Sequence, residues 1–235
     1  MSRTFFAVVG GLLAVVSVWA TPTSVWAKTC KPYKTVIKVE MKNPEVMFNH
    51  KLSVAELNRH FKNTGKRGQG LNGWHSGASY IRGVTSTDPD LRYRFLPGYW
   101  RSGSQYCFGV KELTLNFGFK SQTVYIPRIY DRHSCEYKVV KAHEDRHVKI
   151  NQEGLKIYAA KAKKILAQKL SKSAVAVVNS EKAGVEAMKK VINAAAEDVY
   201  KGMNKHILPK HGAIDSTESY RRDDAKCSNW VRDVR

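Results

Sequence analysis

The spacing of apolar residues divides the chain into two regions. Between residues 28 and 130, apolar and polar positions mostly alternate, and this period of two predicts half-buried strands. The alternation is clearest where Leu113, Leu115 and Phe117 are separated by Thr114 and Asn116. From residue 131 to 208 the period rises to about three and a half, which predicts helices. We therefore expect an α+β protein.

The first region is expected to form an antiparallel sheet. A strand is predicted over 33–41, and a meander over 79–85, 91–96, 105–119 and 123–126. A turn at Lys120-Ser121-Gln122 would join the last two strands. Ser53 followed by Glu56 has capping-box spacing and predicts a short helix. Residues 62–76 are rich in glycine and predict a loop that lacks the Gly-Lys-Ser/Thr ending of a phosphate-binding motif.

The second region is expected to form a long helical hairpin. Ser134 would cap a first helix ending near Leu170, and a second would follow from Ala174 to about His206. The hairpin would pack against the sheet. The expected organisation is a single domain over 28–235, with strands mainly in 28–130, the hairpin in 131–208 and an irregular tail in 209–235.

The first 27 residues have the pattern of a secretory signal peptide. Arg3 precedes an apolar stretch, and Val25-Trp26-Ala27 is a small-residue exit, so we expect cleavage after Ala27. No later segment is long and apolar enough to cross a bilayer. The expected location of the protein is the periplasm or the cell exterior.

The cysteine count supports an oxidising location. Cys30, Cys107, Cys135 and Cys227 follow the predicted cleavage point, and an even number in an exported chain indicates two disulfides with three possible pairings. We favour the pairs Cys107–Cys135 and Cys30–Cys227. Zinc binding by cysteines is the alternative, but the chain lacks the C-x-x-C spacing typical of it.

The chain is strongly basic. It has 40 Lys+Arg against 20 Asp+Glu, a formal net charge of +20. Such a charge attracts polyanions, and in an exported protein the expected partners are anionic envelope polymers, with no specific nucleic acid. The alternative is a solvated surface that only keeps the protein soluble.

The most informative motif is His143-Glu144-Asp145-Arg146-His147, an H-E-x-x-H pentad within the first predicted long helix. On a helix the two imidazoles lie one turn apart and can bind one zinc ion, while Glu144 acts as general base toward the attacking water. Both histidines fall on the apolar stripe of the helix, which indicates that they face inward. The alternative is a pair of solvated histidines.

A catalytic zinc site needs a third protein ligand. The metzincin extension would require Gly and His where Ile150 and Glu153 stand, so that subclass is excluded. A hairpin folded near residue 172 would bring Glu197 opposite the motif, and Glu197 is therefore the predicted third ligand. The alternatives are His211, Asp215 and Glu218.

The segments Val124-Tyr125-Ile126, Ser134-Cys135-Glu136-Tyr137 and Ala142 to Val148 resemble a group of small exported proteobacterial proteins described as predicted secreted zinc-dependent proteases. Residues 214–220 and Cys227 are similar to the C-terminal end of that group. The resemblance implies a zincin-like metal site and export. The basic segment 62–75 departs from the group's pattern, so no shared substrate is implied.

These observations predict a secreted or periplasmic zinc-dependent hydrolase, a metallopeptidase acting through a zinc-activated water. Its substrate would be a peptide, with cell-wall peptides suggested by charge and location. One alternative is a non-catalytic basic envelope protein that binds anionic polymers. Another is a zincin-like protein that keeps zinc only for structure.

Overall fold

The structure is a computed structural model that describes residues 33–64, 82–102, 105–173, 176–228 and 230. The predicted signal peptide and most of the predicted glycine-rich loop lie outside the described residues. Within them, no helix combines the length and the apolar character needed to cross a membrane.

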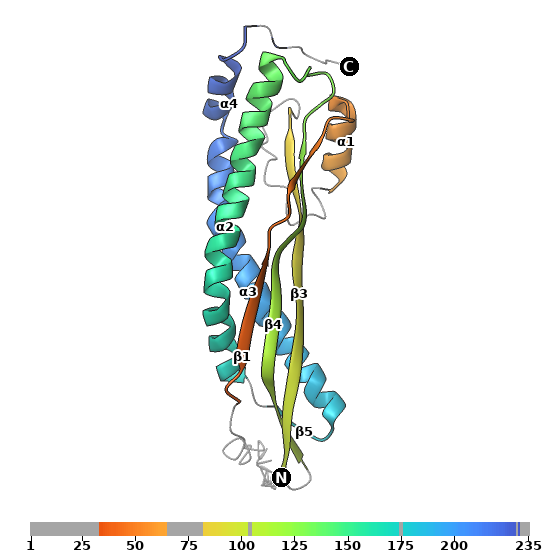
Figure 1. The fold of residues 1–235 in the computed structure, drawn as a ribbon, viewed down its shortest axis with the longest axis vertical. Coiled ribbons are helices and arrows are strands. Elements are labelled where there is room, and N and C mark those ends of the chain that lie inside the picture. Colours follow the sequence, from red (N-terminus) through yellow and green to blue (C-terminus); the bar gives the residue numbers. More distant parts are fainter. Residues whose placement is uncertain (1–32, 65–81, 103–104, 174–175, 229, 231–235) are drawn as a thin grey trace, which may run out of the picture.

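The described chain forms one sheet organised around a single long strand, β4 (Gln105–Tyr125). The strand β3 (Val84–Ser102) pairs antiparallel along one edge of β4. Three short strands share the other edge: β5 (Ala176–Val178), β1 (Val36–Lys42) and β2 (Val46–Asn49). Figure 1 shows the result, a sheet much longer than it is wide.

The predicted antiparallel meander is wrong. Strands β1 and β2 run parallel to β4, and only β3 and β5 are antiparallel to it. The predicted turn at Lys120-Ser121-Gln122 is also wrong, because β4 continues through it. Gln122 is buried there and its side-chain amide donates to Asn43 Oδ1 at 2.8 Å. A polar triplet that resembles a turn is thus stabilised as strand by a partner far away in the sequence.

Two predicted strands, 79–85 and 91–96, belong to one strand, although residues 79–81 lie outside the described part. Strand β3 contains Pro89 and Pro97, and the register with β4 shifts at both. Proline lacks an N–H and is tolerated at sheet edges and bulges. Because β3 pairs with β4 alone among the described strands, neither proline ends it.

Two of the helices, α1 and α2, begin where the sequence predicts caps. Helix α1 (Val54–Thr64) has the expected reciprocal bonds between Ser53 and Glu56. Helix α2 (Cys135–Ser173) starts after Ser134, whose Oγ accepts from the backbone N–H of Tyr137 at 3.1 Å. Both predicted caps are confirmed.

The second long helix starts and ends later than predicted. Helix α3 spans Glu181–Ile214 and continues through Pro209. Ile207 and His211 are buried on either side of that proline, so packing offsets the lost backbone bond. The predicted irregular tail contains a further helix, α4 (Thr217–Asp224), capped by Ser216.

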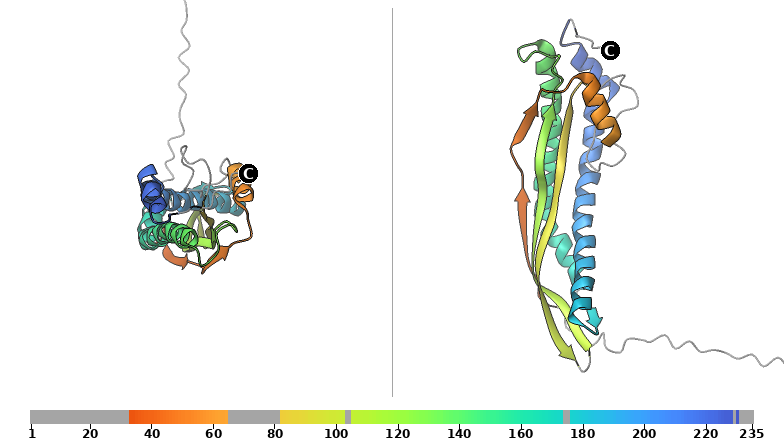
Figure 2. Two further views of the ribbon diagram at one scale, coloured as in Figure 1. Left: turned by 90° about the horizontal axis from the view of Figure 1, so that it is seen from above. Right: turned by 90° about the vertical axis from the view of Figure 1, so that its right-hand side faces the viewer.

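The long helices pack on one face of the sheet, as the two views of Figure 2 show. The core combines residues from β1, β4, α2 and α3, and its largest fully buried side chains include Leu113, Leu115, Phe117, Leu155, Leu166, Met188 and Ile192. The other face of β4 carries partly exposed polar residues such as Thr114 and Asn116. One face of the sheet is therefore buried, as the alternation predicted.

Neither predicted disulfide pair is correct, because Cys135 is joined to Cys227. This bond ties the start of α2 to the segment after α4. Cys107 is also disulfide-bonded, but it lies beside β5, which follows the far end of α2. The 39 residues of α2 span roughly 58 Å, so Cys107 and Cys135 are too far apart to pair.

Candidate metal centre

Three buried donor groups meet where the N-terminal part of α2 packs against the end of α3. His143 and His147 lie one turn apart on α2, and Asp215 is the C-cap of α3. The three residues are 5%, 4% and 2% exposed. Asp215 Oδ1 is 3.1 Å from His143 Nε2 and 3.0 Å from His147 Nε2, and the two nitrogens are 3.3 Å apart. The group could hold a metal ion.

The triangle of donor atoms fits a tetrahedral zinc ion. Bonds of about 2.0–2.1 Å in tetrahedral geometry place neighbouring ligand atoms about 3.3–3.4 Å apart. The observed separations of 3.0–3.3 Å are close to that value. Two imidazole nitrogens and one carboxylate oxygen are also a ligand set typical of catalytic zinc, with a fourth position for water.

His143 is held by a second carboxylate. Its Nδ1 lies 3.1 Å from Asp223 Oδ2 on α4, which leaves Nε2 for the triangle. Asp223 also accepts from Arg146 and Lys226, each at 2.6 Å. Burial works against the charge of Asp223, but these bonds outweigh it and lower its pKa. Burial likewise acts to lower the pKa of His143, and its bonds to the two aspartates raise it overall.

His147 is held by a third histidine. Its Nδ1 lies 2.7 Å from Nδ1 of His211, and Nε2 of His211 lies 3.0 Å from Asn151 Oδ1. Burial and the neighbouring His147 lower the pKa of His211 to about 4, so its ring is neutral at physiological pH. His211 therefore stands behind a triangle residue and does not join the triangle.

Glu144, the predicted general base, is 4% exposed and faces the first residues of β3. Its Oε2 accepts from the Thr85 hydroxyl at 2.8 Å. A Cβ at Gly83 would lie 2.7 Å from Oε1, so only glycine leaves room for the carboxyl group there. Burial raises the pKa of Glu144 despite the opposing charges of the two histidines.

A small pocket with a cavity volume of about 20 Å³, room for one or two water molecules, opens beside these groups. His143, Glu144, Tyr220 and Asp223 line its polar side, and Val139, Val140 and Trp230 contribute an apolar wall. The guanidinium of Arg82 stacks over the Trp230 ring, with its central carbon 4.6 Å from the centroid, and pairs with Asp224. The candidate base thus faces a partly apolar space.

Tyr220 joins the site from α4. Its ring stacks on His143 with centroids 5.0 Å apart, and its hydroxyl donates to Asp215 Oδ1 at 3.3 Å. Burial and the charge of Asp215 raise its pKa. Tyr220 and Asp223 were not among the predicted site residues, although Asp215, Ser219 and Asp223 recur every four residues, a helical spacing within the expected tail.

The structure separates the four predicted third-ligand residues. Asp215 meets both histidines. Glu197 is exposed and bonds Lys201. It precedes Asp215 by eighteen residues on α3, which is a distance of roughly 27 Å along the helix. Glu218 is exposed and pairs with Arg222. Glu197 was expected from a fold-back near residue 172, but β5 separates the helices and α3 starts only at residue 181. Because β5 and the segment after it lie between the two helices, the end of α3 lies opposite the motif, and the middle of α3 does not.

Comparisons with known proteins give no match for this chain among family models, curated proteins or solved structures. The resemblance to predicted secreted zinc-dependent proteases stays a prediction. The class of protein has to be inferred from the donor triangle, the buried glutamate and the pocket.

Proposed function

We propose that His143, His147 and Asp215 bind one zinc ion and that the protein is a secreted or periplasmic metallopeptidase. The observation that carries the proposal is the triangle of donor atoms 3.0–3.3 Å apart, buried beside a glutamate in an H-E-x-x-H motif. When bound, zinc supplies Lewis acidity, which makes water acidic enough to be a nucleophile near neutral pH.

Glu144 is the general base in this proposal. It accepts a proton from the attacking water and transfers it to the leaving amine of the peptide. Burial raises the pKa of Glu144, and a base is most efficient when its pKa lies near the working pH. The hydroxyl of Thr85 holds one carboxylate oxygen, which orients the group toward the pocket.

Tyr220 is a second group suited to the reaction. Peptide hydrolysis places negative charge on the carbonyl oxygen, and hydrogen-bond donors directed at that oxygen stabilise it. The raised pKa of Tyr220 keeps its hydroxyl protonated, and this hydroxyl lies beside Asp215 at the pocket. We therefore assign Tyr220 as the donor to the developing oxyanion.

A peptide substrate agrees with the pocket and the charge. The pocket is large enough for the attacking water, and Val139, Val140 and Trp230 form an apolar wall beside Glu144 against which an apolar part of the peptide would pack. The net charge of +20 favours substrates embedded in an anionic polymer, such as peptides of a cell wall. The Cys135–Cys227 disulfide is compatible with an oxidising compartment outside the cytoplasm.

Metal analysis and one substitution test the proposal. Protein without a histidine tag should bind about one zinc per chain. Glu144→Gln should keep zinc and lose at least about a hundredfold in hydrolysis of a peptide library, since a general base contributes about 10²–10⁴-fold. Glu153→Gln, on the exposed side of the same helix, is the control and should hydrolyse normally. If Glu144→Gln binds zinc and hydrolyses peptides as fast as the wild type, Glu144 is not the general base. If the wild type binds zinc but hydrolyses no peptide, the metal is structural, and absence of zinc would refute the proposal.

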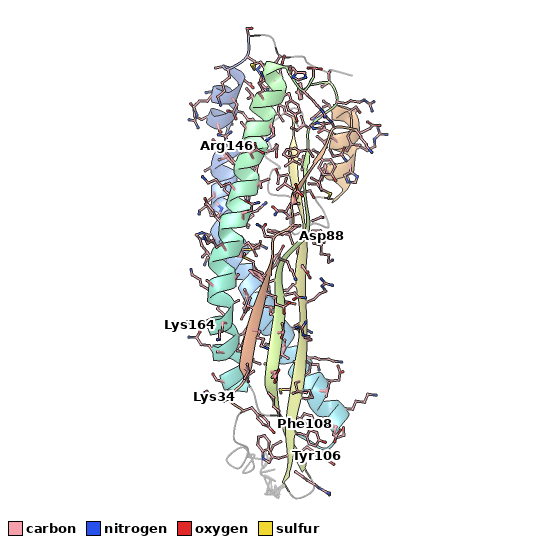
Figure 3. The ribbon with its side chains drawn as sticks, viewed as in Figure 1. Lys34, Asp88, Tyr106, Phe108, Arg146 and Lys164 are labelled. Carbon is pink, nitrogen blue, oxygen red and sulfur yellow. A yellow bond between two sulfur atoms is a disulfide. The ribbon has the colours of Figure 1, made fainter. Side chains whose placement is uncertain are left out.

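The second candidate function is binding of anionic polymers without catalysis. It is favoured by the lysines on the outer side of α2, where Lys149, Lys156, Lys163 and Lys164 are exposed; Figure 3 labels Lys164 toward the end of α2 farther from the site. Affinity for an anionic cell-wall polymer should then fall steeply with added salt. A flat salt response would exclude this function.

A further inference from the structure

The two histidines of the triangle have different hydrogen-bond partners at Nδ1, the ring nitrogen that faces away from the triangle. His143 bonds a carboxylate that is itself held by Arg146 and Lys226. His147 bonds an imidazole, His211, that ends on an amide oxygen of Asn151. All three members of the second chain are 3–6% exposed, so water does not replace these bonds.

We infer that His211 and Asn151 form a hydrogen-bond relay that fixes His147 in the tautomer whose Nε2 lone pair faces the metal. The inference rests on the proposed zinc site and names two positioning residues for it. Neither His211 nor Asn151 offers an atom to the donor triangle.

The direction of the relay follows from its last member. The Oδ1 atom of Asn151 only accepts, so His211 must donate from Nε2. At the other end of the relay, Nε2 of His147 lies in the donor triangle, and a nitrogen that binds a metal carries no hydrogen, so the single hydrogen between the two rings belongs to Nδ1 of His147 and Nδ1 of His211 accepts it. His147 therefore donates from its own Nδ1 over 2.7 Å, and its Nε2 has no hydrogen. A metal needs an imidazole nitrogen in that state.

The relay also joins the two helices that supply the ligands. Asn151 follows His147 by four residues on α2, and His211 precedes Asp215 by four residues on α3. Each positioning residue is thus one helical turn from a ligand on its own helix. The His211–Asn151 bond holds α2 and α3 together directly behind the triangle, so it sets the spacing of the ligands as well as the tautomer.

Loss of the acceptor should weaken metal binding without removing a ligand. Partners behind a metal-binding histidine typically contribute about 10–100-fold in affinity. His211→Leu removes the acceptor and should weaken zinc binding by about that factor. His211→Asn puts an amide oxygen close to the position of Nδ1 and should restore most of the affinity. His206→Leu is the matched control, because His206 is a partly buried histidine on the same helix that contacts Tyr158 instead.

The affinity arm uses competition between each full-length variant and a zinc chelator, with circular dichroism to confirm folding. If His211→Leu binds zinc as tightly as the wild type, the relay has no positioning role. The same holds if His211→Asn is as weak as His211→Leu, because the acceptor would then not matter.

A second arm observes the tautomers directly. Nitrogen-15 NMR of the imidazoles should find His147 protonated at Nδ1 and His211 protonated at Nε2, both in zinc-loaded and in chelator-treated protein. A proton on Nδ1 of His211 would overturn the inference even if zinc binds. Expected tautomers in a protein that binds no zinc would support the relay and refute the proposed function, so the two failures are distinguishable.

Discussion

The two halves of α2 bury the same inner face with opposite chemistry. Toward its N-terminus the buried side chains are largely polar, and toward its C-terminus they are apolar. The first set includes Glu136, His143, Glu144, His147 and Asn151, and the second comprises Leu155, Ala162, Leu166 and Leu170. Both sets follow the helical spacing of three to four residues.

The difference shows that burial alone does not determine what a helix face does. The apolar half packs on the sheet and the middle of α3, where Ile192 and Val199 are fully buried. The polar half is covered by the end of α3 and by α4, which supply Asp215 and Asp223. Buried polar groups are costly unless they are partnered, so a helix that buries this many indicates a functional site at that end.

The largest expected effect comes from removing the carboxylate of Asp215, which contacts both histidines in the polar half of α2. Asp215→Asn keeps the shape but replaces an anionic ligand by a neutral one. Zinc affinity should fall by on the order of a thousandfold, about 4 kcal/mol, which exceeds the effect of partners behind a ligand. Chelator competition measures it. Asp198→Asn, whose partner on α2 is Lys169, is the control and should bind zinc normally. Equal affinity of both variants would exclude Asp215 as a ligand.

In the apolar half the expected effect is on stability instead of metal binding. Leu166 is fully buried, and Leu166→Ala should lower the free energy of unfolding by about 3 kcal/mol through lost burial and a cavity. Zinc affinity of the folded protein should stay within about twofold, because the site lies on another part of α2. Urea unfolding measures the first quantity. The exposed neighbour Lys164→Ala should change stability by less than about 0.5 kcal/mol.

The sequence predicted the polar half better than its surroundings. Helical period and the H-E-x-x-H spacing are local, so the inward positions of His143 and His147 and the Ser134 cap were accessible from a short segment. The third donor was not, because it depends on where α3 begins. The three residues of β5 and the start of α3 at residue 181 decide that Asp215, and not Glu197, meets the motif.

Strand partners were less predictable for a similar reason. Alternation in 105–119 identified a strand but not the direction of its neighbours. Strand β1 pairs parallel with β4 across more than seventy residues of sequence, with Val36 opposite Glu112. The pairing of Cys135 with Cys227 could not be predicted either, because it depends on helix α4. That helix is short and lies in a polar segment that we predicted to be an irregular tail.

The two halves meet at Gly154, and this position tests whether they are mechanically linked. A Cβ at Gly154 would lie 2.3 Å from Ile207 Cγ2, so Gly154→Ala forces Ile207 to shift, and we expect the shift to move the adjoining part of α3 away from α2. Stability should fall by about 1–2 kcal/mol, since overpacking outweighs the better helix propensity of alanine. Zinc affinity should fall several-fold, because Asp215 lies on the displaced helix. Titration with zinc during thermal unfolding measures both.

Gly212→Ala is the matched control on α3. A Cβ there meets nothing within 4 Å, so alanine should stabilise the helix by up to about 1 kcal/mol and leave zinc binding unchanged. If both glycine variants behave alike, the close contact at Gly154 does not position the ligands.

The smallest expected effect concerns Glu144, whose burial should make the polar half less stable than it could be. Burial raises the folded-state pKa of this carboxyl above its value in the unfolded chain, about 4.3. As pH rises above that value, the unfolded state loses its proton first, so the metal-free fold loses stability. Gln does not titrate, and Glu144→Gln should therefore be more stable than the wild type at pH 7, by on the order of 1 kcal/mol, and equal to it below about pH 4. Urea unfolding of chelator-treated protein at both pH values measures the difference. If Glu144→Gln is less stable than the wild type at pH 7, the surrounding residues stabilise the ionised carboxylate. Burial of Glu144 would then not destabilise the fold, and its burial would not be evidence for a catalytic role.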